Sequence, residues 1–121
     1  MLAIYNPKGF LILARKLLTD DNYKVDGRTR TAIGRAYYAA FLASKAKQEK
    51  RGHRFPDDHK VHMAVIDSFH DDNLSHIASK LDELKEYRSN ADYHMNTNIL
   101  SVEGNKCLEL AENVFKMLES I

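Results

Sequence analysis

Residues 33–44 read IGRAYYAAFLAS, and this stretch decides the fold class because it is apolar nearly all the way round a helix. In a helix predicted from about residue 28 to residue 51, one stripe holds Ile33, Ala36, Tyr37, Ala40, Phe41 and Ser44. The opposite side carries Tyr38, Ala39, Leu42 and Ala46, with Arg35 as a charge. A helix that is apolar on both sides is covered on both sides. We expect one side to face a bundle core and the other to meet a second copy of the chain through Tyr38 and Leu42. The alternative is that this helix is the centre of a monomeric bundle.

Apolar periodicity predicts a helix before this stretch and a short one after it. Asn6 and Pro7 are typical of a helix start, and the apolar face that follows predicts a helix to about residue 19. The polar run that comes next predicts a loop through residues 20–27. After a second loop, Asp57 or Asp58 caps a short helix whose inward residues are Val61, Ala64, Val65 and Phe69.

Two further helices complete the prediction. The first has the apolar stripe Leu74, Ile77, Ala78, Leu81, Leu84 and Ala91, and it ends or bends near Tyr93, before a linker at residues 96–98. Ser101 caps the last helix, whose inner face is Cys107, Leu110, Ala111, Val114, Phe115, Leu118 and Ile121. The predicted fold class is all-α: an antiparallel up-down four-helix bundle with an additional short helix, in a single domain over residues 1–121.

Composition supports a soluble globular domain. The 121 residues are 44% hydrophobic and 29% charged, which is ordinary for this class. No apolar run approaches the roughly 18 residues that span a bilayer, and the first residues lack the regions of a signal peptide. The single Cys107 excludes an intramolecular disulfide framework, and we expect it to be a small buried hydrophobe. These features favour a cytoplasmic protein.

Charge is unevenly distributed along a chain whose formal net charge is +1. Residues 28–54 hold eight basic side chains and one acidic side chain, whereas residues 55–121 hold six basic and thirteen acidic ones. A localised positive surface gathers phosphates even when the whole protein is nearly neutral. Arg28, Arg30 and Arg35 are therefore the candidate RNA-binding residues. The alternative is a solvated helix face that pairs with the acidic half of the chain.

Residues 87–94, YRSNADYH, place an arginine and a histidine where helical packing alone would not put them. Arg88 falls inside the apolar stripe of its helix, and a guanidinium that cannot lose its proton needs a partner or a wet cleft there. His94 converges with Arg88 only if the helix ends or bends near Tyr93. In the alternative interpretation, Arg88 and Asp92 form an ordinary ion pair four residues apart and His94 is a polar helix-end residue.

Metal binding has little support in the sequence. His59 and His62 lie one helical turn apart, but two histidines without a fixed third ligand are a weak signal. We therefore expect them, like His53, His70 and His76, to be surface or loop residues. No phosphate-binding glycine loop or paired-cysteine zinc signature is present in the sequence, and we expect neither a metal nor a cofactor.

Two segments together resemble the HEPN superfamily, the nucleotide-binding domains of higher eukaryotes and prokaryotes. They are RAYYAAF at residues 35–41 and RSNADYH at residues 88–94, in which five residues separate the arginine from the histidine. The order and length of the expected helices also agree with that family, and the small stand-alone prokaryotic members are the most similar.

The resemblance implies a metal-independent endoribonuclease that works as a homodimer, often as a toxin of a toxin–antitoxin pair or in phage defence. It implies that Arg88 and His94 are the catalytic positions, supported by Ser89, Asn90 and Asp92. Active members usually carry Asn, Asp or His after the arginine, where this chain has Ser89, with Asn90 next to it. The tyrosine that partner nucleotidyltransferases modify in one toxin subgroup is Asn96 here.

The chemistry agrees with that expectation. RNA carries its own nucleophile, the 2′-hydroxyl, so cleavage needs a base, an acid and positive charge on the transition state. An imidazole can be the acid or base near neutral pH, and a forked guanidinium suits a phosphate whose charge is growing. The alternative function is a catalytically inactive HEPN module that binds nucleotide, RNA or a partner protein such as a nucleotidyltransferase.

Overall fold

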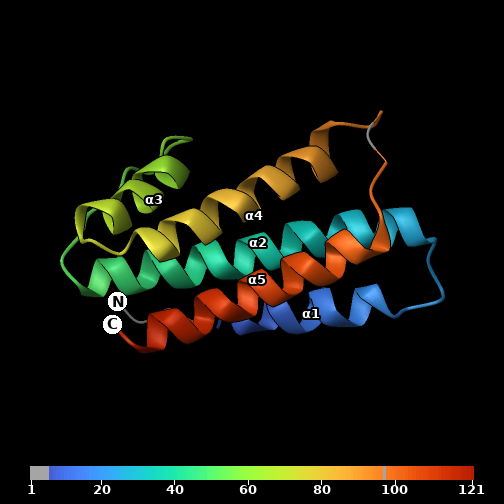
Figure 1. Cartoon of the computed structure of the whole chain (residues 1–121), viewed down its shortest axis with the longest axis horizontal. Coiled ribbons are helices and arrows are strands. Elements are labelled where there is room, and N and C mark those ends of the chain that lie inside the picture. Colours follow the sequence, from blue (N-terminus) through green and yellow to red (C-terminus); the bar gives the residue numbers. More distant parts are fainter. Residues whose placement is uncertain (1–5, 97) are drawn as a thin grey trace.

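The computed structural model describes residues 6–96 and 98–121, which form five helices (Figure 1). Their bounds are α1 Lys8–Leu18, α2 Val25–Lys50, α3 Val61–Asp71, α4 Ser75–Tyr93 and α5 Ser101–Glu119. Chain direction alternates through α1, α2, α4 and α5, and the short α3 lies beside α4. The predicted all-α bundle with an additional short helix is confirmed. Thr97 of the predicted linker and the first five residues lie outside the described residues.

Helix α2 is the centre of the bundle because it packs against each of the other four helices. Its small residues Ala36, Ala39 and Ala40 are fully buried, which lets neighbouring backbones approach closely. Helix α1 covers part of the side on which we expected a second copy. Tyr38 and Leu42 stay half-buried there, and the Tyr38 ring centroid lies 6.2 Å from that of Phe10. The role of these two residues in a dimer stays a prediction.

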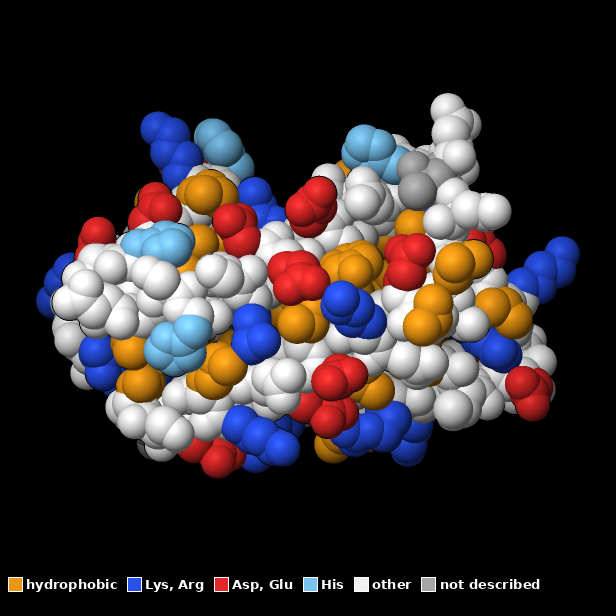
Figure 2. All heavy atoms as spheres, in the orientation of Figure 1, with side chains coloured by type: hydrophobic (Ala, Val, Ile, Leu, Met, Phe, Trp, Pro, Cys, Tyr) orange, Lys and Arg blue, Asp and Glu red, His pale blue; other side chains and the backbone are white. Residues whose placement is uncertain are grey.

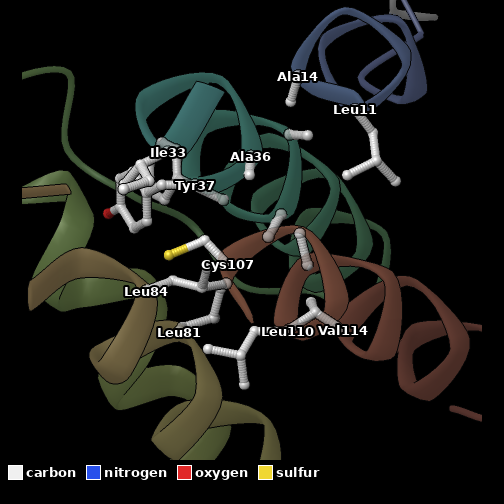
Figure 3. Close-up of a cluster of buried hydrophobic side chains, with 14 of the residues drawn as sticks. Leu11, Ala14, Ile33, Ala36, Tyr37, Leu81, Leu84, Cys107, Leu110 and Val114 are labelled. Atoms are coloured by element: carbon white, nitrogen blue, oxygen red, sulfur yellow. The ribbon is translucent and has the colours of Figure 1, made fainter. Parts of the chain in front are cut away.

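The core lies between α2, α4 and α5, with α1 closing one side (Figure 3). The predicted stripes of α4 and α5 supply most of its large side chains, among them Ile77, Leu81, Leu84, Leu110 and Val114. Each such side chain contributes about 1.5–3 kcal/mol when fully buried. Cys107 is buried among them as expected, and burial raises the pKa of its thiol to about 12. None of the described helices is long and apolar enough to cross a bilayer.

Three predicted caps can be compared with the structure. Asn6 Oδ1 accepts the Lys8 N–H at 3.0 Å, and Asp58 Oδ1 accepts the Lys60 N–H at 2.9 Å, but the cap residues are Pro7 and Lys60, neither of which makes a side-chain cap hydrogen bond. The prediction for Ser101 was wrong. It is the first residue of α5, and the preceding Leu100 is the cap residue, with extended backbone and no side-chain hydrogen bond.

Helix α2 begins at Val25, so the predicted loop ends at Lys24, and its extension through residues 25–27 was wrong. Asp26 lies in the first turn, where a negative charge is stabilised by the helix dipole. Its Oδ2 accepts a hydrogen bond from Arg30 Nε at 3.0 Å, and the Thr31 hydroxyl bonds the Gly27 carbonyl at 2.9 Å. Gly27 is a poor helix former, and these two hydrogen bonds stabilise the first turn that contains it.

Candidate active site at the end of helix α4

Arg88 is held at the C-terminal end of α4 by one carboxylate and three aromatic rings. Its Nε donates to Asp92 Oδ2 at 3.0 Å. The guanidinium carbon lies 5.6 Å, 6.0 Å and 5.9 Å from the ring centroids of Tyr37, Tyr38 and Tyr93. The ion pair with Asp92 that we considered as an alternative is therefore present. Because the rings share the contact with the cation, Asp92 accounts for only part of the position of Arg88.

A groove of about 610 Å³ runs along α4 beside Arg88. Its lining is polar and comprises Asp82, Glu83, Lys85, Glu86, Arg88, Ser89 and Tyr93. The three carboxylates come first along the helix, and Arg88, Ser89 and Tyr93 lie toward its C-terminal end. In Figure 2 the surface is also visibly hollowed between α3 and the end of α4. Arg88 therefore borders a space that a substrate can reach.

His94 lies immediately after α4, which ends at Tyr93 as predicted. It is exposed, and its backbone N–H donates to the Asn90 carbonyl at 3.2 Å. Its side chain does not line the groove that contains Arg88, and no contact joins the two side chains in the described part of the chain. A single chain therefore brings Arg88 and Asp92 together but leaves the imidazole of His94 free in solvent.

The two predicted supporting residues beside Arg88 face different spaces. Ser89 lines the groove with Arg88. Asn90 lines an adjoining hollow of about 310 Å³ with Glu83, Glu86 and Tyr87. Ser89 is thus the neighbour that shares the groove with the guanidinium.

The three candidate RNA-binding arginines all make contacts within the chain. Arg30 Nη1 donates to the carbonyl of Ala91 at 2.9 Å and lies 3.5 Å from that of His94, so it binds carbonyls that the end of a helix leaves unpaired. Arg28 Nη1 donates to the Asp20 carbonyl at 2.7 Å and thereby fixes the loop between α1 and α2. Their role in RNA binding stays a prediction.

Arg35 lies on the same aromatic surface as Arg88. Its guanidinium carbon is 5.3 Å from the ring centroid of Phe10 and 5.4 Å from that of Tyr38. Tyr38 therefore contacts both cations, one from α2 and one from α4. Two guanidinium groups that share one half-buried ring form a positive, aromatic surface next to the groove.

His62 of α3 belongs to the surroundings of Arg88, which the sequence did not indicate. Its Nδ1 lies 2.6 Å from the Tyr37 hydroxyl, and its ring stacks on Phe41 with centroids 4.2 Å apart. Burial, followed by the charges of Arg88 and Lys85, lowers the pKa of His62. The prediction of a surface histidine was wrong here, because α3 folds back over α2. His59, His70 and His76 are exposed as predicted.

Tyr37 connects this histidine to the arginine. The Tyr37 ring is buried against Arg88, and burial raises the pKa of its hydroxyl, which therefore keeps its proton. The hydroxyl lies 2.6 Å from His62 Nδ1 and donates to it in the tautomer that carries the imidazole proton on Nε2. No group of three or more metal-ligating side chains occurs within residues 6–96 and 98–121.

The chain was compared with models of known protein families, with curated proteins and with solved structures. The family model of the HEPN domain matches residues 8–121, which is nearly the whole chain. No curated protein and no solved structure matches it. The matched region contains all five helices and every residue of the site described above. The chain therefore belongs to the HEPN domain family.

Proposed function

We propose that the protein is a metal-independent endoribonuclease whose active site combines Arg88 and His94 in the cleft of a homodimer. Family membership favours a function related to nucleotides or RNA, and HEPN domains commonly dimerise. The observation that carries the proposal is the position of Arg88. A cation fixed by Asp92 and three rings borders an open groove, six residues before an exposed imidazole at the end of the same helix.

The proposed reaction uses the 2′-hydroxyl of RNA as the nucleophile. His94 takes the proton from this hydroxyl while water gives one to the departing 5′-oxygen, or His94 gives that proton while water takes the first, as an imidazole can near neutral pH. The 2′-oxygen forms a bond to phosphorus while the bond to the 5′-oxygen breaks. Arg88 stabilises the negative charge that grows on the phosphate. The products are a 2′,3′-cyclic phosphate and a free 5′-hydroxyl, and no metal takes part.

A second copy of the chain completes the site in this proposal. The His94 imidazole does not reach Arg88 within one chain, so an imidazole from the partner is the simplest way to bring both groups to one phosphate. Tyr38 and Leu42 are half-buried beside this region and are the contacts that we propose for the partner. A toxin or phage-defence ribonuclease with a cognate antitoxin is the biological role that we propose.

RNA cleavage in EDTA tests the function directly. We expect the purified protein to cut RNA and leave 2′,3′-cyclic phosphate ends. His94→Ala should lower the rate by about 100-fold to 10,000-fold, the usual loss for one positioned acid or base. His76→Ala is the matched control, because His76 is another exposed histidine of α4, near its opposite end. Equal rates for the wild-type chain and His94→Ala would contradict the proposal.

One observation favours a second candidate, a HEPN module that binds RNA or nucleotide without cutting it. Ser89 lines the groove beside Arg88, in a position where the active members that the chain resembles usually carry Asn, Asp or His. A catalytically inactive domain should show no RNA cleavage in EDTA but should still bind RNA. Its affinity for RNA should fall in Arg88→Ala. A partner nucleotidyltransferase would be a natural ligand for such a module.

A further inference from the structure

We propose that Tyr93 is a nucleobase-stacking subsite that restricts the substrate to unpaired RNA. This inference rests on the proposed function, because it places one base of the substrate next to the phosphate that Arg88 binds. Tyr93 lines the groove together with Arg88 and Ser89, and it directly precedes His94 in the chain. The subsite thus lies beside the guanidinium to which we assign the binding of the phosphate.

The exposure of Tyr93 is the first observation. Its relative exposure is 68%, the largest among the exposed large hydrophobic side chains of the described residues. Arg88 lies over the ring with its guanidinium carbon 5.9 Å from the centroid, and the high exposure leaves much of the ring open to solvent. An exposed aromatic ring beside a cationic side chain is a usual stacking platform of proteins that bind single-stranded nucleic acid.

Charge along the groove is the second observation. Three carboxylates, those of Asp82, Glu83 and Glu86, and one cation, Lys85, line the part that lies toward the start of α4, which is therefore net acidic. Arg88 lies near Tyr93. A phosphate chain is repelled from the acidic part and drawn to the guanidinium. The phosphate and its adjacent base therefore meet the protein at the Tyr93 end.

The third observation is that the residues following Tyr93 at the end of α4 are exposed. Tyr93 is the last residue of α4, and the residues that follow, His94, Met95 and Asn96, are all exposed. A base that stacks on this ring must leave its neighbours in the RNA, and a base within a duplex is already stacked and paired. Single-stranded RNA supplies such a base at the least cost.

Binding of 2′-O-methyl RNA separates this inference from the catalytic one, because that RNA lacks the nucleophile and is not cut. The probe is a labelled single strand with one 2-aminopurine, a base whose fluorescence is quenched when it stacks. We expect the wild-type protein and Tyr93→Phe to bind it equally and to quench it. Tyr93→Leu keeps apolar bulk without a π-face, and its affinity should be about 5-fold to 150-fold lower, with no quenching. A fully paired duplex should bind more weakly than the single strand and equally to all three proteins.

Tyr23→Leu is the matched control, because Tyr23 is 60% exposed but lies in the loop between α1 and α2. Unchanged affinity and quenching in Tyr93→Leu would overturn the subsite. Normal cleavage of ordinary RNA by the wild-type protein would leave the proposed function intact in that case. Loss of the dimer in Tyr93→Leu, measured by analytical ultracentrifugation, would also overturn it, because Tyr93 would then be an interface residue. Binding that depends on Tyr93 without cleavage of ordinary RNA would support the subsite and contradict the nuclease.

Discussion

Two clusters in this bundle each pair an arginine with an aspartate, but they are built in opposite ways. In the first, Asp72 is the centre: its Oδ2 lies 3.0 Å from Gln48 Nε2, 2.9 Å from His53 Nε2 and 3.4 Å from Arg51 Nη2. In the second, Arg88 is the centre, and among the described residues only Asp92 accepts a hydrogen bond from it.

The number of partners distinguishes a structural cluster from a candidate functional one. Several donors converge on the Asp72 carboxylate, and the hydrogen bond from Gln48, followed by that from His53, lowers its pKa. This cluster joins the end of α2 to the end of α3 and leaves little capacity to bind anything else. Arg88 donates to one carboxylate, Asp92, and otherwise lies against tyrosine rings, so it keeps donors available beside the groove. The same residue types therefore serve packing in one place and remain available for a phosphate in the other.

The comparison predicts that the shape of the arginine matters in only one of the clusters. Arg88→Lys keeps the charge but removes the fork that binds two phosphate oxygens, and we expect the rate of RNA cleavage to fall by about 100-fold to 1,000-fold. Arg51→Lys is the matched control and should leave the rate unchanged, because Arg51 is only one of several donors to Asp72. Similar losses in both variants, measured with one RNA substrate, would remove the distinction.

Stability should respond in the reverse way. Gln48 is fully buried, and its Nε2 donates to Ser68 Oγ and to Asp72, each at 3.0 Å. Gln48→Glu replaces this donor with a carboxylate that faces Asp72, so the free energy of unfolding should fall by about 3 kcal/mol at neutral pH. Urea denaturation followed by circular dichroism measures the change.

Asn105→Asp is the control for the Gln48 variant, because it makes the same chemical change at an exposed residue of α5. Its effect should stay within about 0.5 kcal/mol. The folded fraction of Gln48→Glu should still cut RNA at the wild-type rate. A stability equal to the wild type would mean that the Asp72 cluster does not hold the helix ends together.

The smallest expected effect is a pH dependence at His62, which connects α3 to the Arg88 cluster. Tyr37 from α2 and Arg88 and Lys85 from α4 face this imidazole, and burial and the two cations lower its pKa below the ordinary value. The unfolded chain therefore binds more protons as the pH falls through about 6.5. The stability that the neutral imidazole contributes is fully present above that pH and is lost as the pH falls toward the folded pKa.

Unfolding in urea at about pH 7.5 and about pH 5.5 measures this dependence, over a range that spans the ordinary pKa of histidine. His62→Asn should lose less stability between the two pH values than the wild-type protein. His59→Asn, one turn earlier and exposed, should behave like the wild type. An equal acid-induced loss in His62→Asn would show that another group causes it.

The sequence predicted most of the fold because each helix has a clear apolar face. Most of the predicted stripe of α4 and of the predicted inner face of α5 is buried, with Leu74, Phe115 and Ile121 half-buried, and α4 ends at Tyr93. The start of α2 was predicted too late, because the hydrogen bonds of Asp26 and Thr31 that stabilise its first turn are not visible in a periodicity. Local patterns thus specify the elements better than their ends.

The site was predicted less completely because its parts come from different helices. Arg88 was indicated by its place inside an apolar stripe, and Asp92 by the helical spacing. The hydrogen bond between Tyr37 and His62 joins residues 25 positions apart, and the binding of the α4 carbonyls by Arg30 spans 60 positions or more. No local pattern encodes these contacts, since they arise only when α3 and α4 pack on α2.

Mixing two inactive variants tests the central claim most directly, namely that one Arg88 and one His94 act together between two copies of the chain. Arg88→Ala and His94→Ala should each be inactive alone, since each removes one of the two groups. If the proteins are unfolded together and refolded as a mixture, mixed dimers contain one intact arginine and one intact histidine. We predict that the mixture regains cleavage well above that of either variant. A mixture as inactive as its components, although mixed dimers are present by mass spectrometry, would contradict the claim.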